Sequence, residues 1–141
     1  MRFLYFLLLC ITITSNISAQ HQRIMHRTFQ LDTATILELD LFGEFTVETW
    51  VGSDVMIETN VRISNVPEGI FNHYIKEGRY AIEEKREGET LLLVSKQKER
   101  PKIKTPKGDS EEIVTVKVFI PDVMEASGDK RWTKPKDEKK D

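Results

Sequence analysis

Apolar and polar residues alternate with a period of two along most of the chain. In residues 35–42 (TILELDLF) three leucines fall on one side of an extended backbone and the acidic residues fall on the other. The same alternation covers residues 44–51 and 55–63. A period of two is typical of a strand with one buried face. Because short glycine-containing breaks separate these segments, we expect consecutive antiparallel hairpins.

The same pattern predicts further strands and one interruption. The other expected strands cover residues 26–31, 80–84, 90–96 and 113–120. In residues 65–77 (NVPEGIFNHYIKE) the apolar positions instead fall at i, i+1, i+4 and i+5, which favours one short helix near 67–77. We therefore expect an all-β fold of about six or seven short antiparallel or solenoid-like strands with one short helix.

The first 19 residues have the composition of a secretory signal peptide. Arg2 precedes eleven uncharged residues, 3–13, and small polar residues then lead to Ala19. An apolar core of this length fits a cleavable signal and is too short for a membrane-spanning helix, although an uncleaved anchor is the alternative. We expect cleavage after Ala19, export to the periplasm or the cell surface, and no transmembrane span in the remainder. Cys10, the only cysteine, would leave with the signal, so no disulfide is expected.

Two later segments contain many charges and few apolar residues. Residues 97–111 (QKERPKIKTPKGDSE) predict an exposed loop or a β-arm. Residues 126–141 (ASGDKRWTKPKDEKKD) contain Trp132 as their only large apolar side chain, which predicts a disordered tail whose deletion leaves folding intact. The expected division is thus a signal peptide at 1–19, a β-rich domain at 20–125 and a charged tail at 126–141.

Charge gives two candidate partner-binding features. The formal net charge of the chain is −2 with mixed signs, so there is no general attraction to nucleic acid or anionic membrane. Within it, Lys98, Arg100, Lys102 and Lys104 alternate along the predicted arm, and aromatic residues are not interleaved with them, which argues against nucleic acid. This run either contacts an anionic partner, such as envelope polysaccharide or lipid phosphate, or is a charged edge that prevents strand aggregation. Trp132, isolated among charges, is a candidate docking point for another envelope protein.

No group of residues carries a recognisable catalytic or metal-binding pattern. The three histidines are His21, His26 and His73, and the last is expected on the surface of the helix. Cleavage after Ser18 instead of Ala19 would give an Ala-Gln-His N-terminus suited to Cu(II) or Ni(II), but the expected cleavage removes that arrangement. The carboxylates fall on predicted polar faces without the spacing of a calcium loop. We expect no catalysis, no metal and no cofactor.

Part of the chain resembles a known family. Residues 37–40 (LELD), 43–50 (GEFTVETW) and 53–58 (SDVMIE), with a later VFIP at 118–121, are similar to the block of short strands in exported bacterial proteins of the DUF4097 adhesin-like family. The resemblance covers residues 29–122 and implies a β-solenoid or β-sandwich-like stack. Only one copy of the block is present, and a solenoid needs about three, so we expect a compact β-domain.

These observations lead to two functional hypotheses. The first is an exported, non-catalytic binding or structural protein of the cell envelope, of adhesin-like type, with polysaccharide or another envelope protein as its partner. The alternative is an accessory or regulatory periplasmic protein that docks a partner through residues 126–141.

Overall fold

A computed structural model describes residues 19–136 of the chain, and the signal peptide predicted at 1–19 lies outside it except for Ala19. The described part is mostly strand, with one short helix, as the alternation predicted. Its elements in order are β1 (Gln20–Phe29), β2 (Ile36–Asp40), β3 (Phe45–Trp50), β4 (Val55–Ser64), α2 (Glu68–Lys76), β5 (Ile82–Glu87), β6 (Thr90–Ser95), β7 (Lys104–Thr105), β8 (Gly108–Asp109), β9 (Glu111–Pro121), β10 (Glu125–Gly128) and β11 (Arg131–Thr133). No helix in residues 19–136 is both long enough and apolar enough to cross a membrane.

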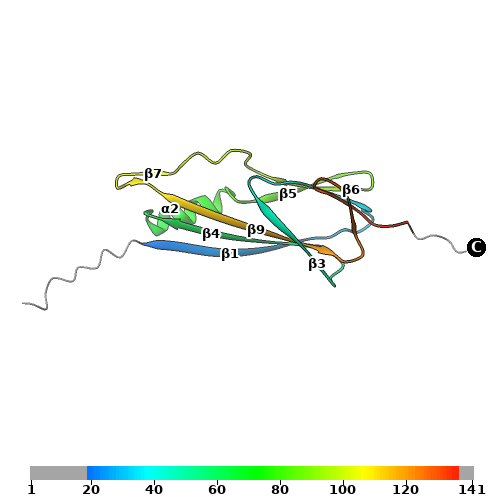
Figure 1. The fold of residues 1–141 in the computed structure, drawn as a ribbon. Coiled ribbons are helices and arrows are strands. Elements are labelled where there is room, and N and C mark those ends of the chain that lie inside the picture. The colour runs from blue at the N-terminus through cyan, green and yellow to red at the C-terminus, as the bar shows by residue number, and fades with distance from the viewer. Residues whose placement is uncertain (1–18, 137–141) are drawn as a thin grey trace, which may run out of the picture.

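Two sheets are formed, and a small hairpin stands apart from them. The first sheet has the strand order β1-β4-β9-β3, and its long strands β1, β4 and β9 run side by side (Figure 1). The second sheet has the order β10-β11-β2-β6-β5, and β7 pairs only with β8. In β4 the residues at odd positions are buried and those at even positions are partly or fully exposed, so one face of the first sheet points inward.

The pairing of the strands differs from the expected series of hairpins. β5 and β6 do form an antiparallel hairpin. However, β2 and β3 lie in different sheets, and each pairs in parallel with a strand distant in sequence: β2 with β6, and β3 with β9. The expectation that residues 35–42, 44–51 and 55–63 pair consecutively is therefore wrong. Alternation determines which side of a strand is buried, but it does not select the neighbouring strand.

The inner face of the first sheet supports two hydrophobic clusters. The larger cluster joins the two sheets: Phe29, Ile57 and Val118 of the first sheet pack with Leu37 and Leu91 of the second. This is face-to-face sheet packing. The smaller cluster lies toward the other end of the sheet, where Val61, Ile63, Phe71, Tyr80 and Ile103 are buried together. Figure 1 shows α2 and β7 at this same end of the molecule.

The helix predicted near 67–77 is confirmed as α2. Pro67 precedes it in an extended conformation, and Phe71 is the side chain that α2 buries in the smaller cluster. Gly78 follows with φ of +75°, a left-handed conformation that glycine adopts without steric cost.

Residues 97–111, for which the sequence predicts an exposed loop or a β-arm, form a β-arm. Its hairpin β7–β8 is anchored by the buried Ile103.

The expected disordered tail needs a correction. Residues 125–133 form the hairpin β10–β11, and β11 pairs antiparallel with β2. Trp132 lies opposite Leu37 and is partly buried against the larger cluster, so it does have a core to enter. Residues 126–141 by themselves contain too little apolar surface to become ordered. The open edge of β2 supplies the hydrogen-bonding partners. Residues 137–141 lie outside the described part.

Candidate functional site

The predicted basic run does not form a single exposed edge. Lys98 forms an ion pair with the carboxylate of Asp40 at the end of β2, and this contact lowers the pKa of Asp40. Arg100 turns inward and lies between two aromatic rings, with its guanidinium carbon 4.8 Å from the ring centre of Phe42 and 5.1 Å from that of Tyr80. These two residues are therefore not equivalent members of one charged surface.

The remaining residues of the run stay at the surface. Lys102 and Lys104 are exposed, and Lys104 belongs to β7. Trp132, the other predicted partner-binding residue, lies in the second sheet. Lys102 and Arg100 line one pocket, and Trp132 lines a different one. The structure thus separates the two predicted features into two places.

The pocket beside Trp132 is the larger of the two, with a volume of about 780 Å³. It lies between the edge strand β3 with its neighbour β9 on one side and the turn of the β10–β11 hairpin on the other. We call it the inter-sheet pocket. Its lining consists of Gly43, Glu44, Phe45, Thr46, Val114, Thr115, Val116, Gly128, Asp129, Lys130 and Trp132. A volume of this size is within the range of pockets that hold small organic ligands.

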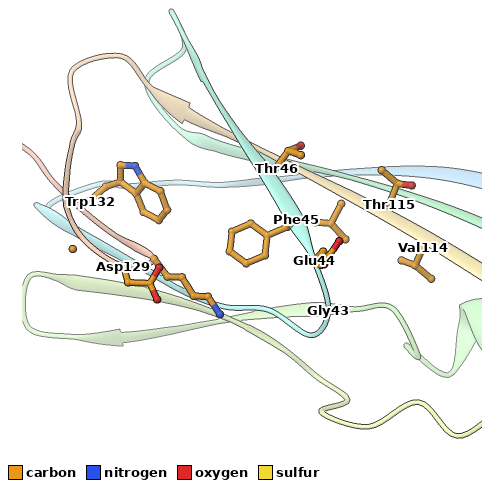
Figure 2. Close-up of a pocket in the computed structure, with 11 residues that line it drawn as sticks. Gly43, Glu44, Phe45, Thr46, Val114, Thr115, Asp129 and Trp132 are labelled. Carbon is orange, nitrogen blue, oxygen red and sulfur yellow. The ribbon is translucent and has the colours of Figure 1, made fainter.

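Two aromatic side chains give the inter-sheet pocket its apolar surface. Figure 2 shows Phe45 pointing toward Trp132 across the pocket. Both side chains are partly buried and pack against the larger cluster, so their inner parts are held by the core and their outer parts face the pocket. The ammonium of Lys130 lies 5.9 Å from the centre of the Phe45 ring, at the outer limit of a cation–π contact.

Backbone pairing holds the two walls in place. Phe45 lies opposite Val116 in the parallel ladder between β3 and β9. On the other wall, Arg131 of β11 forms an ion pair with Glu38 of β2 at 2.7 Å. The backbone N–H of Leu39 donates to the carbonyl of Lys130, at 3.0 Å. Backbone pairing therefore holds the strand part of each wall, while Gly43, Glu44, Asp129 and Lys130 line the pocket from the segments that connect the strands.

The polar groups of the pocket surround this aromatic pair. Glu44 and Asp129 supply carboxylates, Lys130 supplies one ammonium, and Thr46 and Thr115 supply hydroxyls. Aromatic faces bind flat apolar surfaces, whereas the hydroxyls and carboxylates accept hydrogen bonds. The arrangement therefore suits a ligand that has an apolar face and several hydrogen-bond donors at its edges.

Sequence reasoning found Trp132 but missed its partners in the inter-sheet pocket. Phe45 looked like one more inward position of an alternating strand, and Asp129 and Lys130 looked like members of a tail. The local signal that was available is the Gly-Asp-Lys turn at 128–130, where Lys130 adopts a left-handed conformation with φ of +58°. Such a turn indicates a hairpin, but it does not indicate which strand the hairpin joins.

A buried ionic network lies at the other end of the first sheet. The Arg79 side chain is 5% exposed, and its Nε donates to Oε2 of Glu112 at 2.9 Å. Its Nη2 donates to the carbonyl oxygen of Pro101 at 2.7 Å, and the Tyr80 hydroxyl also donates to Oε2 of Glu112, at 2.7 Å. Burial, followed by the hydrogen bond to Glu112, raises the pKa of Tyr80 far above its ordinary value. The network links the segment after α2 to β9.

The two histidines of β1, His21 and His26, contact residues of neighbouring segments. His21 Nε2 lies 3.0 Å from the carbonyl oxygen of Val66, and His26 pairs with Glu58 at 2.9 Å. His73 is exposed on α2, as predicted. Within residues 19–136 there is no group of three or more His, Cys, Asp or Glu side chains that could hold a metal ion.

Comparisons with family models, with curated proteins and with solved structures give no match to this chain.

Proposed function

We propose that this protein is an exported, non-catalytic binding protein of the cell envelope, of adhesin-like type, and that the inter-sheet pocket binds a saccharide. The observation that carries the proposal is the meeting of Phe45 and Trp132, from different sheets, in one pocket of about 780 Å³. The signal peptide predicted at 1–19 would deliver the protein to a compartment rich in polysaccharide. The resemblance of residues 29–122 to adhesin-like proteins agrees with a binding role.

The chemistry of the lining favours a saccharide over a purely apolar ligand. A sugar ring has one face of C–H groups that can lie on an aromatic ring, and its hydroxyls can donate to carboxylates and threonine hydroxyls at the rim. Glu44 and Asp129 outnumber the single ammonium of Lys130. We therefore expect a neutral or amino-bearing saccharide in this pocket rather than an acidic one.

The two tryptophans of the chain provide a direct test with an internal control. Trp132 lines the pocket, whereas Trp50 lies outside it, donates to the carbonyl of Asp54 at 2.9 Å and packs edge-on against Phe119. The purified protein is titrated with cello- and chito-oligosaccharides by calorimetry, beside the variants Trp132→Leu and Phe45→Leu. We expect each of these variants to weaken binding about 10-fold or more, because stacking on an aromatic ring contributes over 1 kcal/mol. Trp50→Phe should leave the affinity unchanged.

Thermal unfolding of each variant separates loss of binding from loss of the fold. Phe45→Leu retains an apolar side chain of similar volume, so it keeps the proposal testable if Trp132→Leu is too unstable. Absence of binding to both neutral and amino-bearing oligosaccharides by the folded wild-type protein would overturn the proposal. Equal weakening by the Trp50 control would also overturn it, because the effect would then not come from the pocket.

A further inference from the structure

We propose a second binding site, separate from the inter-sheet pocket, in which Arg100 holds the carboxylate or sulfate group of an acidic saccharide. This site is the pocket of about 600 Å³ at the base of the β7–β8 arm. Arg100, Lys102 and Ser110 line it, together with the carboxylates of Asp109, Glu111 and Glu112. We call it the arm pocket. It shares no residue with the inter-sheet pocket, so the inference does not rest on the function proposed above.

Arg100 has no direct counter-ion within residues 19–136, and the nearby charge of Glu112 offsets only part of the effect of burial on its pKa. Its Nε is buried and has no hydrogen-bond partner, and the guanidinium forms no ion pair with any residue in 19–136. Within residues 19–136 the guanidinium makes cation–π contacts with the rings of Phe42 and Tyr80. Its carbon lies 4.8 and 5.1 Å from the two ring centres. Burial lowers the pKa of Arg100, which reflects the free-energy cost of keeping this charge out of water. Arg100 as a whole is only partly buried and lines the arm pocket, so a bound oxyanion would accept hydrogen bonds from the part of the guanidinium that reaches the pocket.

The neighbouring carboxylate is already neutralised by another residue. Glu112 accepts hydrogen bonds from Arg79 and from the hydroxyl of Tyr80. Arg79 thus has a direct counter-ion, whereas Arg100, which lies over the Tyr80 ring, forms no ion pair in the part of the chain that the structure describes. The stacking also limits the orientations of the Arg100 guanidinium, because contact with both rings restricts its plane. A restricted guanidinium loses less conformational entropy when it forms two parallel hydrogen bonds to an oxyanion.

Ser110 provides a second buried polar group in the same pocket. Its Oγ is buried and has no hydrogen-bond partner within the described part of the chain. The backbone N–H of Ser110 donates to the carbonyl of Ile103 at 3.0 Å, and this bond closes the base of the β-arm. The position of Ser110 is therefore set by the arm and by the buried Ile103. Because this Oγ has almost no exposed surface, it can donate to a bound oxyanion only after the Ser110 side chain rotates, so Arg100 is the main donor of the site.

The charges at the mouth of the arm pocket define the class of ligand. Lys102, Asp109 and Glu111 are exposed there, so one cation lies beside two carboxylates that form no ion pair with residues 19–136. These carboxylates repel an anion in proportion to its charge, so they disfavour a multivalent anion such as inorganic phosphate more than a singly charged group that pairs with Arg100. They accept hydrogen bonds from sugar hydroxyls, however. A saccharide with a single negative charge satisfies both conditions, since its oxyanion reaches Arg100 and its hydroxyls reach the acidic rim.

The test compares oligosaccharides that differ only in their acidic group. The protein, expressed from its full sequence, is titrated by calorimetry with a galactan oligosaccharide that carries one galacturonate residue, with the same oligosaccharide carrying one sulfate ester instead, with the neutral galactan oligosaccharide and with inorganic phosphate. We expect at least one of the two acidic oligosaccharides to bind, and the one that binds identifies the oxyanion. Arg100→Met retains a side chain that can pack between the rings, and it should weaken that binding about 10- to 100-fold, the range for a lost charge-assisted hydrogen bond. Ser110→Ala should weaken it by a smaller factor.

Lys104→Gln is the matched control. Lys104 belongs to the same segment and is exposed, but it does not line the arm pocket. The inference is overturned if neither acidic oligosaccharide binds, if Arg100→Met leaves the affinity unchanged, or if Lys104→Gln weakens binding as much as Arg100→Met does. Binding of inorganic phosphate as tight as that of the oligosaccharides would overturn the saccharide class. The Phe45 and Trp132 variants should bind acidic oligosaccharides normally, so failure here and failure of the inter-sheet pocket are distinguishable.

Discussion

Replacing Glu112 by Gln is expected to destabilise the fold through the buried guanidinium of Arg79. Glu112 is the carboxylate partner of Arg79, at 2.9 Å, and it also accepts the Tyr80 hydroxyl at 2.7 Å. Gln has nearly the same shape but no charge, so Arg79 would remain buried without a counter-ion. Removing one partner of a buried ion pair costs about 3–5 kcal/mol, because the other charge is left uncompensated.

The expected magnitude is somewhat smaller in this structure. Arg79 keeps the carbonyl oxygen of Pro101 as an acceptor, at 2.7 Å, and the Glu112 side chain is 18% exposed, so water reaches part of the site. The Gln oxygen can also accept one of the lost hydrogen bonds. We therefore expect Glu112→Gln to lower the free energy of unfolding by about 2–3 kcal/mol.

Urea unfolding followed by tryptophan fluorescence measures this loss. For a slope of about 1.5 kcal/mol per M urea, the midpoint should fall by about 1.3–2 M. The adjacent Glu111 is exposed and forms no ion pair with residues 19–136, so Glu111→Gln is the matched control and should change stability by less than about 0.5 kcal/mol. If the two variants shift the midpoint equally, the argument that Arg79 needs Glu112 is refuted.

Two further predictions concern alkaline pH and the C-terminal hairpin. The pKa of Tyr80 in the folded state is raised above its unfolded value of about 10, so its contribution to stability is complete below pH 10 and is lost as the pH rises toward the folded value. The melting temperature should fall less steeply above pH 10 in Tyr80→Phe than in the wild-type protein, and equal slopes would contradict this. Deleting residues 125–141 removes β10 and β11, exposes the edge of β2 and uncovers Leu37, so we expect a loss of roughly 3 kcal/mol or more, measured by urea unfolding. A chain that ends after Lys136 keeps both strands and is the control, and equal stability of the two truncated chains would contradict the role of the hairpin.

The two candidate sites show how far local patterns lead. Lys98, Arg100, Lys102 and Lys104 alternate along the sequence, which suggested one charged edge. The positions of Phe42 and Tyr80 draw Arg100 inward, and Asp40 pairs with Lys98. Likewise, Trp132 could be recognised as an unusual aromatic residue. Its meeting with Phe45 depends on strands that are distant in sequence.

The sequence by itself determined the β-rich class, the approximate strand positions, the inward faces and the helix α2. These properties depend on residues within about ten positions of one another, and the alternation of apolar side chains reports them directly. Only the tertiary structure decided that β3 lies beside β9, that β2 lies beside β6, and that residues 125–133 form strands at all. The physical reason is that an edge strand offers backbone hydrogen bonds to any segment that reaches it, so pairing depends on the packing of the whole chain. Both candidate pockets arise from such long-range pairing.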